Sequence, residues 1–595
     1  MFKKSKWIVA DLIDEEVKQK FPEIHPALLQ LLWNRNLRTQ EEMDVYLGPD
    51  WSRDVHSPAL FRQMNEAVQR IFYAFEHKEV ITIHGDYDAD GVCGSALLLT
   101  CLRDISRELS FDVSNSIRPD TICDQQQNNK TKITSYIPHR EKEGYGLSIQ
   151  TVEHLNSHEH TKLIIAVDCG ISNKQAIDFA KTLGIDTIVC DHHTVPDQLP
   201  EKTIIIHPLV CGETYPSKNL CGTAVAFKLA CSLYDEARRR GKKIPEGYEK
   251  WLLDLVAIAT VTDVMPLVKE NRVLEMYGLL VLNKTRRIGL KKLIEISGGK
   301  FGTLDTTSIG FQIGPRLNAA GRINHATEAL DLLMAEDETQ ATELAIRLQE
   351  TNKERQRQSS QMYDEAKVQL STQPLGNLLI AVSDCWAPGL VGLVAGKLVG
   401  EHQRPVYVIG KSDELYVGSG RTFGNFDVTA ALQHASLHLE KFGGHPQACG
   451  FSIRGEENLK SAIELLHSFA AQTISEKDLT PRIEIEKELT LEEVDWNLFE
   501  GIERCRPFGQ GNPEPLFCAL GLSLVSFVQV GNEGKHLKLS VQSPAGRIMP
   551  AIAFGFGDRA QNFILGQPLD LAFHIRVNEW NGNRELQLQV EDISN

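Results

Sequence analysis

The sequence lacks any apolar run that approaches the roughly 20 residues needed to cross a membrane. Its N-terminus, Met-Phe-Lys-Lys-Ser-Lys-Trp, leads into acidic residues and not into the apolar core of an export signal. The 12 cysteines are scattered singly without a C-x-x-C pair, which argues against a disulfide framework and against structural zinc. We therefore expect reduced thiols in a cytoplasmic protein that has no membrane partner.

The sequence also has fewer basic than acidic residues. Lys and Arg number 63 against 79 Asp and Glu, which gives a formal net charge of −16. This balance argues against a protein held to nucleic acid by bulk electrostatics. It is compatible with an enzyme whose carboxylates hold metal ions and whose arginines line one groove. The basic run over 238–243 is interpreted as the solvated end of a helix and not as a DNA-binding patch.

A chain of 595 residues is too long for one hydrophobic core, so several domains are expected. Residues 76–325 alternate short β-rich runs with helical patterns, which predicts a parallel sheet covered on both faces. The expected strands span 80–83, 163–167, 187–190 and 203–206, and a helix is expected near 93–103. In such a sheet, functional sites form at the C-terminal ends of the strands. Residues 1–75 are expected to form an N-terminal extension packed on this catalytic lobe.

The rest of the chain divides into three parts. A charged helical pattern without Pro or Gly over about 326–372 predicts one long connecting helix. Strand and helix patterns return over 373–478 and predict a second α/β domain. Apolar residues then recur with period two, so 479–595 is expected to form a small β-barrel. The polar stretch 119–135 is interpreted as a flexible surface loop.

Four potential metal ligands, His84, Asp86, Asp88 and Asp90, lie within seven positions directly after the first predicted strand. Carboxylates this close repel one another at neutral pH, and a divalent cation removes that repulsion. Carboxylates with imidazole suit manganese or magnesium better than they suit structural zinc, which prefers thiolates. Taken alone, the segment fits equally well an Asp- and Gly-rich turn whose carboxylates are solvated.

Further acidic and imidazole side chains close later apolar runs. Asp168 ends the second predicted strand, the motif Asp191-His192-His193 ends the third, and Asp263 follows the apolar run 255–262. We expect all of them to emerge at the same edge of the sheet. That many ligands suffice for two metal ions that share one carboxylate, a recurring arrangement for the hydrolysis of phosphodiesters.

These motifs resemble those of the DHH phosphoesterase superfamily and, within it, those of the RecJ exonuclease family. The resembling segments are 84–91, 136–140, 144–146, 167–170, 191–193, 262–263, 313–322, 418–421, 443–445 and 507–515. The resemblance therefore covers nearly the whole chain in order. It implies an α/β fold of two lobes, a DHH domain with a parallel sheet and a DHHA1-type domain, joined by a long helix and followed by a C-terminal OB-fold β-barrel.

The resemblance also implies an activity and a set of metal ligands. The activity is that of a single-strand-specific 5′→3′ DNA exonuclease, which hydrolyses phosphodiester bonds by a two-metal mechanism, releases 5′ mononucleotides and acts in DNA repair and recombination. One ion would be held by His84, Asp88 and Asp168. The other would be held by Asp90, Asp168, His192 and Asp263, with Asp168 bridging the two. Mn²⁺ is the expected ion and Mg²⁺ the alternative.

Roles for the surrounding residues follow from the same resemblance. His193 would face the scissile phosphate and Asp86 would be an auxiliary carboxylate, so His193, Asp86 and Asp168 are the expected catalytic residues. Arginine suits this work because its guanidinium binds phosphate through two hydrogen bonds. The expected substrate-binding residues are Arg140, Tyr145, Arg316, Asn318, Arg322, Ser419, Gly420, Arg421, Gly443, Gly444 and His445. Two positions depart from the family pattern, with Ala387 where His is usual and His139 where Asn is common.

The terminal barrel would follow a single strand through a basic groove with aromatic stacking. The candidate contacts are Phe527, Phe554, Lys535, Lys538, Trp580 and Arg584, although aromatic residues of a small barrel are usually part of its core. The expected partners are single-stranded DNA with a free 5′ end, a helicase and a single-strand-binding protein. The expected oligomeric state is a monomer.

Two other functions compete with this one. The first is a DHH-family phosphodiesterase of short oligonucleotides or cyclic dinucleotides, against which the additional barrel and the N-terminal extension argue. The second is a non-catalytic DNA-binding replication scaffold, against which the complete ligand set argues. A nucleotide-driven motor is disfavoured because Pro405 stands where the phosphate-binding motif that ends in Gly410-Lys411-Ser412 requires Gly.

Overall fold

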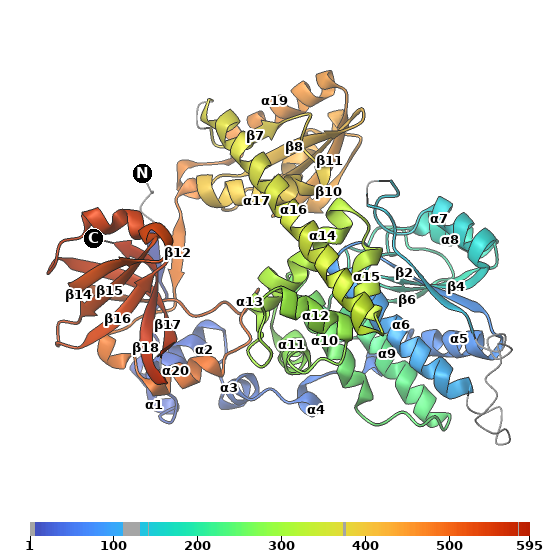
Figure 1. The fold of residues 1–595 in the computed structure, drawn as a ribbon, viewed down its shortest axis with the longest axis horizontal. Coiled ribbons are helices and arrows are strands. Elements are labelled where there is room, and N and C mark those ends of the chain that lie inside the picture. Colours follow the sequence, from blue (N-terminus) through green and yellow to red (C-terminus); the bar gives the residue numbers. More distant parts are fainter. Residues whose placement is uncertain (1–5, 111–130, 141, 373–375, 581, 595) are drawn as a thin grey trace. The chain divides into compact units, whose positions relative to one another are not determined.

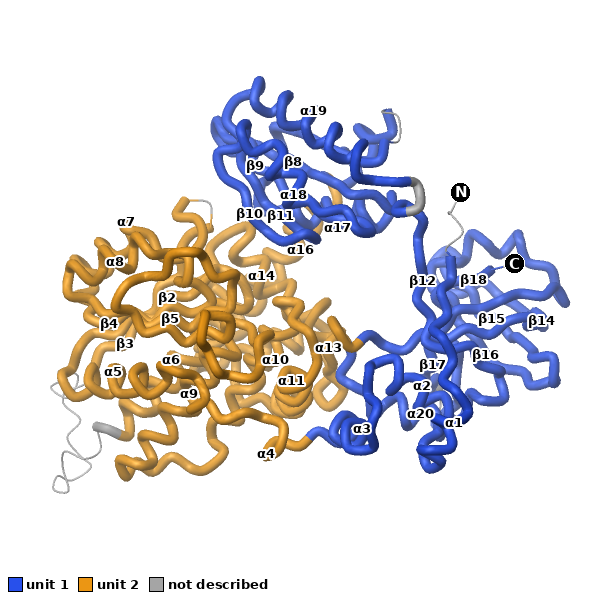
Figure 2. The backbone as a smooth tube through the Cα atoms, turned by 180° about the vertical axis from the view of Figure 1, so that it is seen from behind, with its two compact units in different colours: residues 1–49, 362–508, 513–595 blue, residues 50–361, 509–512 orange. Residues whose placement is uncertain are grey.

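The computed structural model describes residues 6–110, 131–140, 142–372, 376–580 and 582–594 (Figure 1). The chain divides into two compact units, which Figure 2 shows in different colours. Unit 2 comprises residues 50–361 and 509–512, and unit 1 comprises residues 1–49, 362–508 and 513–595. Among the described residues, no helix combines the length and the apolar character that crossing a bilayer requires.

Unit 2 is built on a five-stranded parallel sheet with the strand order β3-β2-β4-β5-β6. The strands are β2 (Val80–Gly85), β3 (Ile133–Tyr136), β4 (Thr161–Val167), β5 (Asp186–Cys190) and β6 (Ile204–Ile206). Neighbouring residues of β4 face opposite sides, because Ile165 belongs to one hydrophobic core and Ile164 to another. The predicted parallel sheet, covered on both faces, is confirmed.

Helices cover both faces of this sheet. The core around Ile165 is shared with α5 (Met64–Glu76), α6 (Ala89–Ser110), α9 (Gly222–Arg239) and α10 (Leu253–Thr262). The core around Ile164 is shared with α7 (Ile149–His154) and α8 (Lys174–Thr182). The further helices that begin in this unit are α4 (Trp51–Asp54), α11 (Lys269–Leu282), α12 (Ile288–Ile296), α13 (Thr306–Ser308), α14 (Gly314–Ile323), α15 (Thr327–Met334) and α16 (Glu338–Ser371).

Two expectations for this part of the chain needed correction. The apolar run before Asp263 is the buried helix α10, so Asp263 follows a helix and not a strand. The predicted single helix over 326–372 is interrupted between α15 and α16. Ala335 has extended backbone there, and the Asp337 side chain accepts the N–H of Gln340 at 2.9 Å, as the cap of a new helix does.

Unit 1 contains the predicted second α/β domain. Its five-stranded mixed sheet has the order β10-β11-β9-β8-β7, in which only β7 and β8 pair in parallel. The strands are β7 (Leu379–Val382), β8 (Val406–Ser412), β9 (Leu415–Arg421), β10 (Lys441–His445) and β11 (Ala448–Arg454). The helices are α17 (Val391–His402), α18 (Val428–His434) and α19 (Glu456–Thr473).

A closed β-barrel follows in the same unit. Its strands are β13 (Lys487–Glu488), β14 (Phe517–Val530), β15 (His536–Gln542), β16 (Ile548–Ala553), β17 (Pro568–Trp580) and β18 (Asn583–Ser594), with α20 (Trp496–Glu503) ahead of β14. The sheet order β13-β14-β15-β16-β18-β17 closes because β14 also pairs with β17. Leu539, Leu571 and Leu588 are buried in the barrel core, as the period-two pattern predicted.

The N-terminal residues belong to unit 1 and pack with the barrel. Strand β1 (Lys6–Val9) pairs in parallel with β12 (Arg482–Ile485). Helices α1 (Glu15–Lys20), α2 (Pro26–Asn34) and α3 (Gln40–Leu47) follow, and Leu28 and Leu31 join the barrel core. Residues 6–49 therefore pack here and not on the catalytic lobe, because the partners of β1 and α2 come from the end of the chain. The later part of the expected extension, with α4 and α5, does belong to the catalytic unit.

The predicted flexible loop over 119–135 is only partly covered by the structure. Residues 119–130 lie outside the described residues. Residues 133–135 are not loop, since they belong to strand β3 and pair with β2.

Candidate metal centre

The first ligand segment joins the end of β2 to the start of α6. His84 is fully buried in β2, where its Nδ1 lies 3.5 Å from the Sγ of Cys169. Asp88 precedes α6, and its Oδ1 accepts the N–H of Asp90 at 2.9 Å and that of Gly91 at 3.2 Å. This is the capping interaction that short acidic side chains make at a helix N-terminus, and it fixes the direction of the carboxylate.

Asp168 follows β4 at the centre of the sheet and is almost completely buried. Its φ of 59° is a left-handed conformation that few residues other than Gly adopt. The Tyr145 hydroxyl donates to the Asp168 carbonyl at 2.9 Å, which helps to hold this backbone. The start of α9 packs against Asp168, because a Cβ placed on Gly222 would lie 2.6 Å from the Asp168 Cβ.

Asp90 is fixed by a second helix. Its Oδ2 accepts the N–H of Gly222 at 2.7 Å, and its Oδ1 accepts the N–H of Thr223 at 2.7 Å. These are free N–H groups of the first turn of α9, where the helix dipole favours negative charge. The carboxylate of Asp90 is therefore positioned between α6, which carries it, and α9, which binds it.

The imidazoles come from the loop after β5. The Nε2 of His192 lies 3.2 Å from Asp168 Oδ1, 3.5 Å from Asp263 Oδ2 and 3.8 Å from Asp90 Oδ2. Asp263 follows the C-terminus of α10, and its backbone N–H donates to Ala259 within the last turn. Strand ends and helix ends thus bring four of the predicted ligands close together, namely Asp90, Asp168, His192 and Asp263.

Three groups of side chains have atoms close enough to share an ion. They are Asp86 with Asp88 and Asp168, Asp90 with His192 and Asp263, and Asp168 with His192 and His193. Atoms within each group lie within 4.8 Å of one another. His84 is in none of these groups, whereas Asp86, expected only as an auxiliary residue, is in one of them.

The chemistry of these side chains fits divalent cations. Among the described residues, His84 Nε2, Asp86 Oδ1, Asp168 Oδ1 and His192 Nε2 are buried atoms without a hydrogen-bond partner. Buried polar atoms are normally satisfied, so this group of atoms fits a site that binds cations. Burial lowers the pKa of His84 to about 4, which keeps its imidazole neutral and able to coordinate.

The carboxylates are destabilised in their charged form. Burial, followed by the charges of Asp90 and Asp88, raises the pKa of Asp168 well above its ordinary value. Burial and then the charge of Asp88 raise the pKa of Asp86 well above its ordinary value. Burial and then the charge of Asp90 raise the pKa of Asp263 to about 9. Cations at this site would reverse these shifts, because they favour the ionised carboxylates.

Asp191 organises the imidazoles, a role that the sequence motif alone did not reveal. Its buried carboxylate accepts the backbone N–H groups of Ile171, His192 and His193 and lies 2.8 Å from His193 Nδ1. Burial alone would lower the pKa of His193, but the hydrogen bond and the charge of Asp191 outweigh burial and raise it. Asp191 therefore both orients His193 and favours its protonated form.

Comparisons with known proteins agree with this geometry. Three family models match the chain: the DHH family N-terminal domain over residues 80–260, the DHHA1 domain over residues 375–472 and the RecJ OB domain over residues 485–592. The chain is 34% identical over 598 residues to the single-stranded-DNA-specific exonuclease RecJ of Bacillus subtilis (strain 168), and the alignment covers 99% of this chain and 71% of that protein. The chain belongs to the RecJ family.

Two further comparisons support this membership. The RecJ of Haemophilus influenzae is 30% identical over 586 residues, with 96% of each chain covered. The crystal structure of RecJ in complex with Mn²⁺ from Thermus thermophilus matches with a TM-score of 0.80 at 26% identity, and the match covers 99% of this chain and 79% of that one. The predicted resemblance to RecJ and the predicted fold class are confirmed.

The substrate-binding residues predicted from RecJ fall into two sets, and the first lies around the metal centre in unit 2. The Tyr145 hydroxyl is 3.0 Å from His193 Nδ1. The Arg140 guanidinium lies over the Tyr87 ring, 4.9 Å from its centroid. Asn318 Oδ1 accepts the first N–H of α6, from Ala89, at 2.8 Å, so this residue supports the ligand loop.

Two further arginines of the first set lie on α14. Arg316 is held by the side chain of Gln349, and burial lowers its pKa. Arg322 is on the same helix, and α14 packs closely on the ligand loop because a Cβ on Gly321 would lie 2.3 Å from the Tyr87 carbonyl. The unusual His139 packs edge-to-face on His325, with ring centroids 5.7 Å apart.

The second set lies on the mixed sheet of unit 1. Arg421 Nη1 donates to Ser419 Oγ at 2.7 Å and to the Gly420 carbonyl at 2.8 Å, and the guanidinium has no carboxylate partner among the described residues. Gly443, Gly444 and His445 form most of the exposed edge strand β10. This set combines a guanidinium with accessible backbone, as a phosphate site requires.

The barrel candidates differ in their exposure. Phe554 is 55% exposed and contacts His536 edge-to-face, and Lys535, Lys538 and Arg584 are exposed. Phe527 instead packs against the barrel core. The side chain of Trp580 lies outside the described residues.

Proposed function

We infer that this chain is a metal-dependent exonuclease that hydrolyses single-stranded DNA from its 5′ end and releases 5′ mononucleotides. The proposal rests above all on one observation, the gathering of carboxylates and imidazoles whose buried atoms have no hydrogen-bond partner in the part of the chain that the structure describes. The named relatives are single-stranded-DNA-specific exonucleases. Every metal ligand that the resemblance predicts is an Asp or His in this chain. The activity serves DNA repair and recombination.

Two divalent cations are proposed, with Mn²⁺ preferred. Asp86, Asp88 and Asp168 would hold one ion, Asp90, His192 and Asp263 would hold the other, and Asp168 would be shared between the two. His84 remains a predicted ligand of the first ion, which its buried Nε2 without a partner supports. When bound, the ions would activate a water molecule and stabilise charge on the attacking and leaving oxygens. The Thermus protein has been solved in complex with Mn²⁺ and with Mg²⁺, which supports a divalent cation and leaves Mg²⁺ as the alternative.

The protein's own groups would orient the substrate and move the proton. Asp191 holds His193 through Nδ1, which would leave Nε2 to face the substrate. Its raised pKa favours the protonated ring, which can donate a hydrogen bond to a phosphate oxygen or a proton to the leaving oxygen. Arg140, Arg322 and Arg421 would bind phosphates of the strand, and the barrel would bind its continuation.

The cellular setting is proposed in broader terms. We propose a cytoplasmic monomer that acts with a helicase and a single-strand-binding protein, because a single-strand-specific enzyme needs its substrate to be unwound. The proposed domains are 76–325 for catalysis, 326–372 as the connection, 373–478 and 479–595 for substrate binding. The family models at 80–260, 375–472 and 485–592 support this division.

The test is product analysis with the full chain and Mn²⁺. A single-stranded oligonucleotide labelled at either end would be followed over time, beside the same sequence as a blunt duplex. We expect early release of the 5′ label as mononucleotide, progressive shortening of the 3′-labelled strand and little action on the duplex. Asp168→Ala should abolish cleavage while DNA binding remains detectable, and the exposed Asp235→Ala on α9 is the matched control.

Each alternative predicts a different result. Hydrolysis of dinucleotides without cleavage of the oligonucleotide would favour the small-nucleotide phosphodiesterase. DNA binding without hydrolysis of either substrate would favour the scaffold. Near-normal activity of Asp168→Ala would contradict the shared-ligand assignment.

A further inference from the structure

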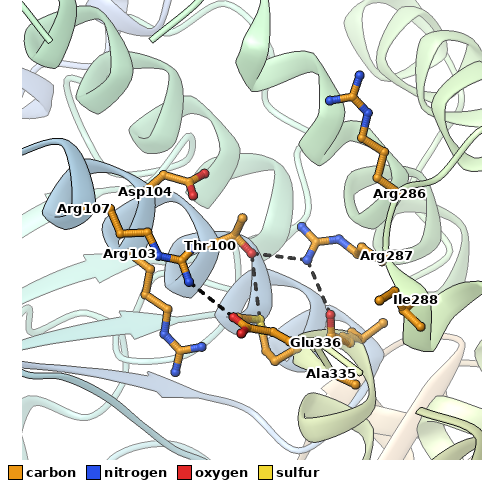
Figure 3. Close-up of a pocket in the computed structure, with 11 residues that line it drawn as sticks. Thr100, Arg103, Asp104, Arg107, Arg286, Arg287, Ile288, Ala335 and Glu336 are labelled. Atoms are coloured by element: carbon orange, nitrogen blue, oxygen red, sulfur yellow. Dashed lines mark hydrogen bonds and ion pairs between the residues drawn. The ribbon is translucent and has the colours of Figure 1, made fainter. Parts of the chain in front are cut away.

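A pocket separate from the metal centre lies in unit 2, where the C-terminal half of α6 meets the start of α12 and the end of α15 (Figure 3). We call it the arginine pocket because Arg103, Arg107, Arg286 and Arg287 line it. Its volume is about 320 Å³. Small-molecule sites occupy roughly 300–1,000 Å³, so the pocket has room for one small ligand.

Positive charge predominates in the arginine pocket. Among the described residues, two carboxylates, Asp104 and Glu336, line it beside the four guanidinium groups. The Arg107–Glu336 pair, at 3.3 Å, is more than half exposed on both sides, so it contributes little stability and a ligand can replace it. Asp104 accepts the hydroxyl of Tyr234 at 3.0 Å. The arginines are therefore incompletely neutralised, although the chain as a whole is acidic.

Two of the arginines have no carboxylate partner among the described residues. Arg103 makes no ion pair there, and Arg286 lies over the Trp251 ring, with its guanidinium carbon 3.5 Å from the ring centroid. Asp104 and Glu336 line the same pocket but leave Arg103 and Arg286 without a carboxylate partner in the described part of the chain, so the charge of these two arginines would favour a bound anion.

Arg287 is held rigidly at the wall of the pocket. Its Nε lies 3.5 Å from the buried Asp254 carboxylate, and its Nη1 donates to Thr100 Oγ1 at 3.2 Å. Its Nη2 has no hydrogen bond within the described part of the chain, and Figure 3 shows the guanidinium beside Thr100. A guanidinium fixed in this way loses little conformational freedom when it binds a planar pair of oxygens.

We propose that the arginine pocket binds a free nucleotide through its phosphate. Guanidinium groups recognise phosphate through paired hydrogen bonds, and several of them distinguish a phosphomonoester from a single carboxylate by charge. Ile288, Leu333 and Met334 provide apolar wall for the sugar and base. The site is distinct from the metal centre, because Arg103 follows Asp90 by 13 residues of α6, or about 20 Å. The proposal does not depend on the exonuclease activity.

The test measures binding to the full chain by calorimetry, first with Mn²⁺ and then in EDTA, which removes any contribution from ions at the metal centre. The probes are 5′-dAMP, inorganic phosphate and deoxyadenosine, and a single-stranded oligonucleotide without a 5′ phosphate. The test variant is Arg103→Gln/Arg107→Gln, and Arg103→Lys/Arg107→Lys keeps the charge. The matched control is Arg357→Gln, an exposed arginine on α16 that pairs with Glu354.

We expect 5′-dAMP and phosphate to bind in EDTA and deoxyadenosine not to bind. The glutamine double variant should raise the Kd for 5′-dAMP about tenfold or more, since hydrogen bonds to charged groups are lost. The lysine variant should retain part of the affinity, and Arg357→Gln should leave it unchanged. Absence of 5′-dAMP binding, or binding that the glutamine variant does not weaken, would overturn the proposal. If the glutamine variant loses affinity only for the oligonucleotide, the pocket binds the DNA strand, and this result would also overturn the proposal.

Discussion

Substitution of Gly222 by Ala tests the geometry of the metal centre most directly. A Cβ on Gly222 would lie 2.6 Å from the Cβ of Asp168, 2.7 Å from its Cα and 2.8 Å from its Oδ1. The N–H of the same glycine donates to Asp90 Oδ2 at 2.7 Å. One methyl group would therefore push against the proposed bridging ligand and displace the helix end that holds a second ligand.

The size of the effect follows from these distances. Ordinary contacts of a Cβ begin at 3.4 Å, so the 2.6 Å gap must open by about 0.8 Å. Neither side yields easily, because Asp168 sits in a left-handed turn and α9 is largely buried. A displacement of about 1 Å at a reacting centre can reduce the rate about 100-fold. Overpacking of this kind also costs about 1–3 kcal/mol of stability.

The assay is the initial rate of mononucleotide release from a 5′-labelled single strand over a range of Mn²⁺ concentrations. We expect a fall in kcat/KM of about 100-fold for Gly222→Ala with the fold retained. Gly400→Ala is the control, because it lies in α17 with nothing within 4 Å of the added Cβ. It should keep the normal rate and gain about 0.5–1 kcal/mol of helix stability. A folded Gly222→Ala protein with normal activity would refute the close packing of α9 on Asp168.

Three further changes have defined outcomes. Asp191→Asn removes the charged acceptor of His193, so the single-turnover rate of DNA cleavage should fall about 10- to 100-fold. An unchanged rate would contradict the role of Asp191 in positioning His193. Glu275 is fully buried, its carboxylate oxygens have no hydrogen-bond partner among the described residues, and burial raises its pKa well above the ordinary value. The unfolded chain therefore releases this proton at lower pH than the folded one, so the free energy of unfolding falls as pH rises. In urea unfolding, Glu275→Gln should be more stable than the natural chain, by a difference that grows between pH 5 and pH 8 by up to about 1.4 kcal/mol per pH unit. A stability difference independent of pH would argue against a raised pKa. Glu486→Ala leaves Arg35 and Asn34 without their shared partner and should destabilise unit 1 by about 3 kcal/mol, measured by thermal unfolding against the exposed Glu484→Ala.

The parts of the fold that could be predicted from the sequence depend on local patterns. Strands β2, β4 and β5 are short apolar runs followed at once by Asp or His, so both the strands and their shared edge could be predicted. The barrel strands show period two, which only a half-buried strand explains. The run before Asp263 is apolar on all sides, and such a run does not distinguish a buried helix from a buried strand. The helix interruption at Ala335 was missed because no Pro or Gly marks it.

The features that could not be predicted depend on residues far apart in the chain. The pairing of β1 with β12 joins residues more than 470 positions apart, and nothing local in either strand specifies the other. The contact between Gly222 and Asp168 and the placement of Asp191 beside His193 depend equally on the assembled sheet. The motif indicated that Asp191 belongs to the site, but its role follows only from its burial and its four hydrogen bonds.

The arrangement of the ligands shows how so acidic a centre can be built into a fold. Asp88 accepts two N–H groups at the start of α6, and Asp90 accepts two at the start of α9. These helix ends supply partial positive charge that the fold itself provides, independent of any ion. Asp168 and Asp86 each keep a buried oxygen without a donor among the described residues, and burial together with neighbouring carboxylates raises the pKa of both. The fold thus orients the two capped carboxylates by itself, and a bound cation would balance the charge of the other two, so metal affinity should depend on Asp86 and Asp168.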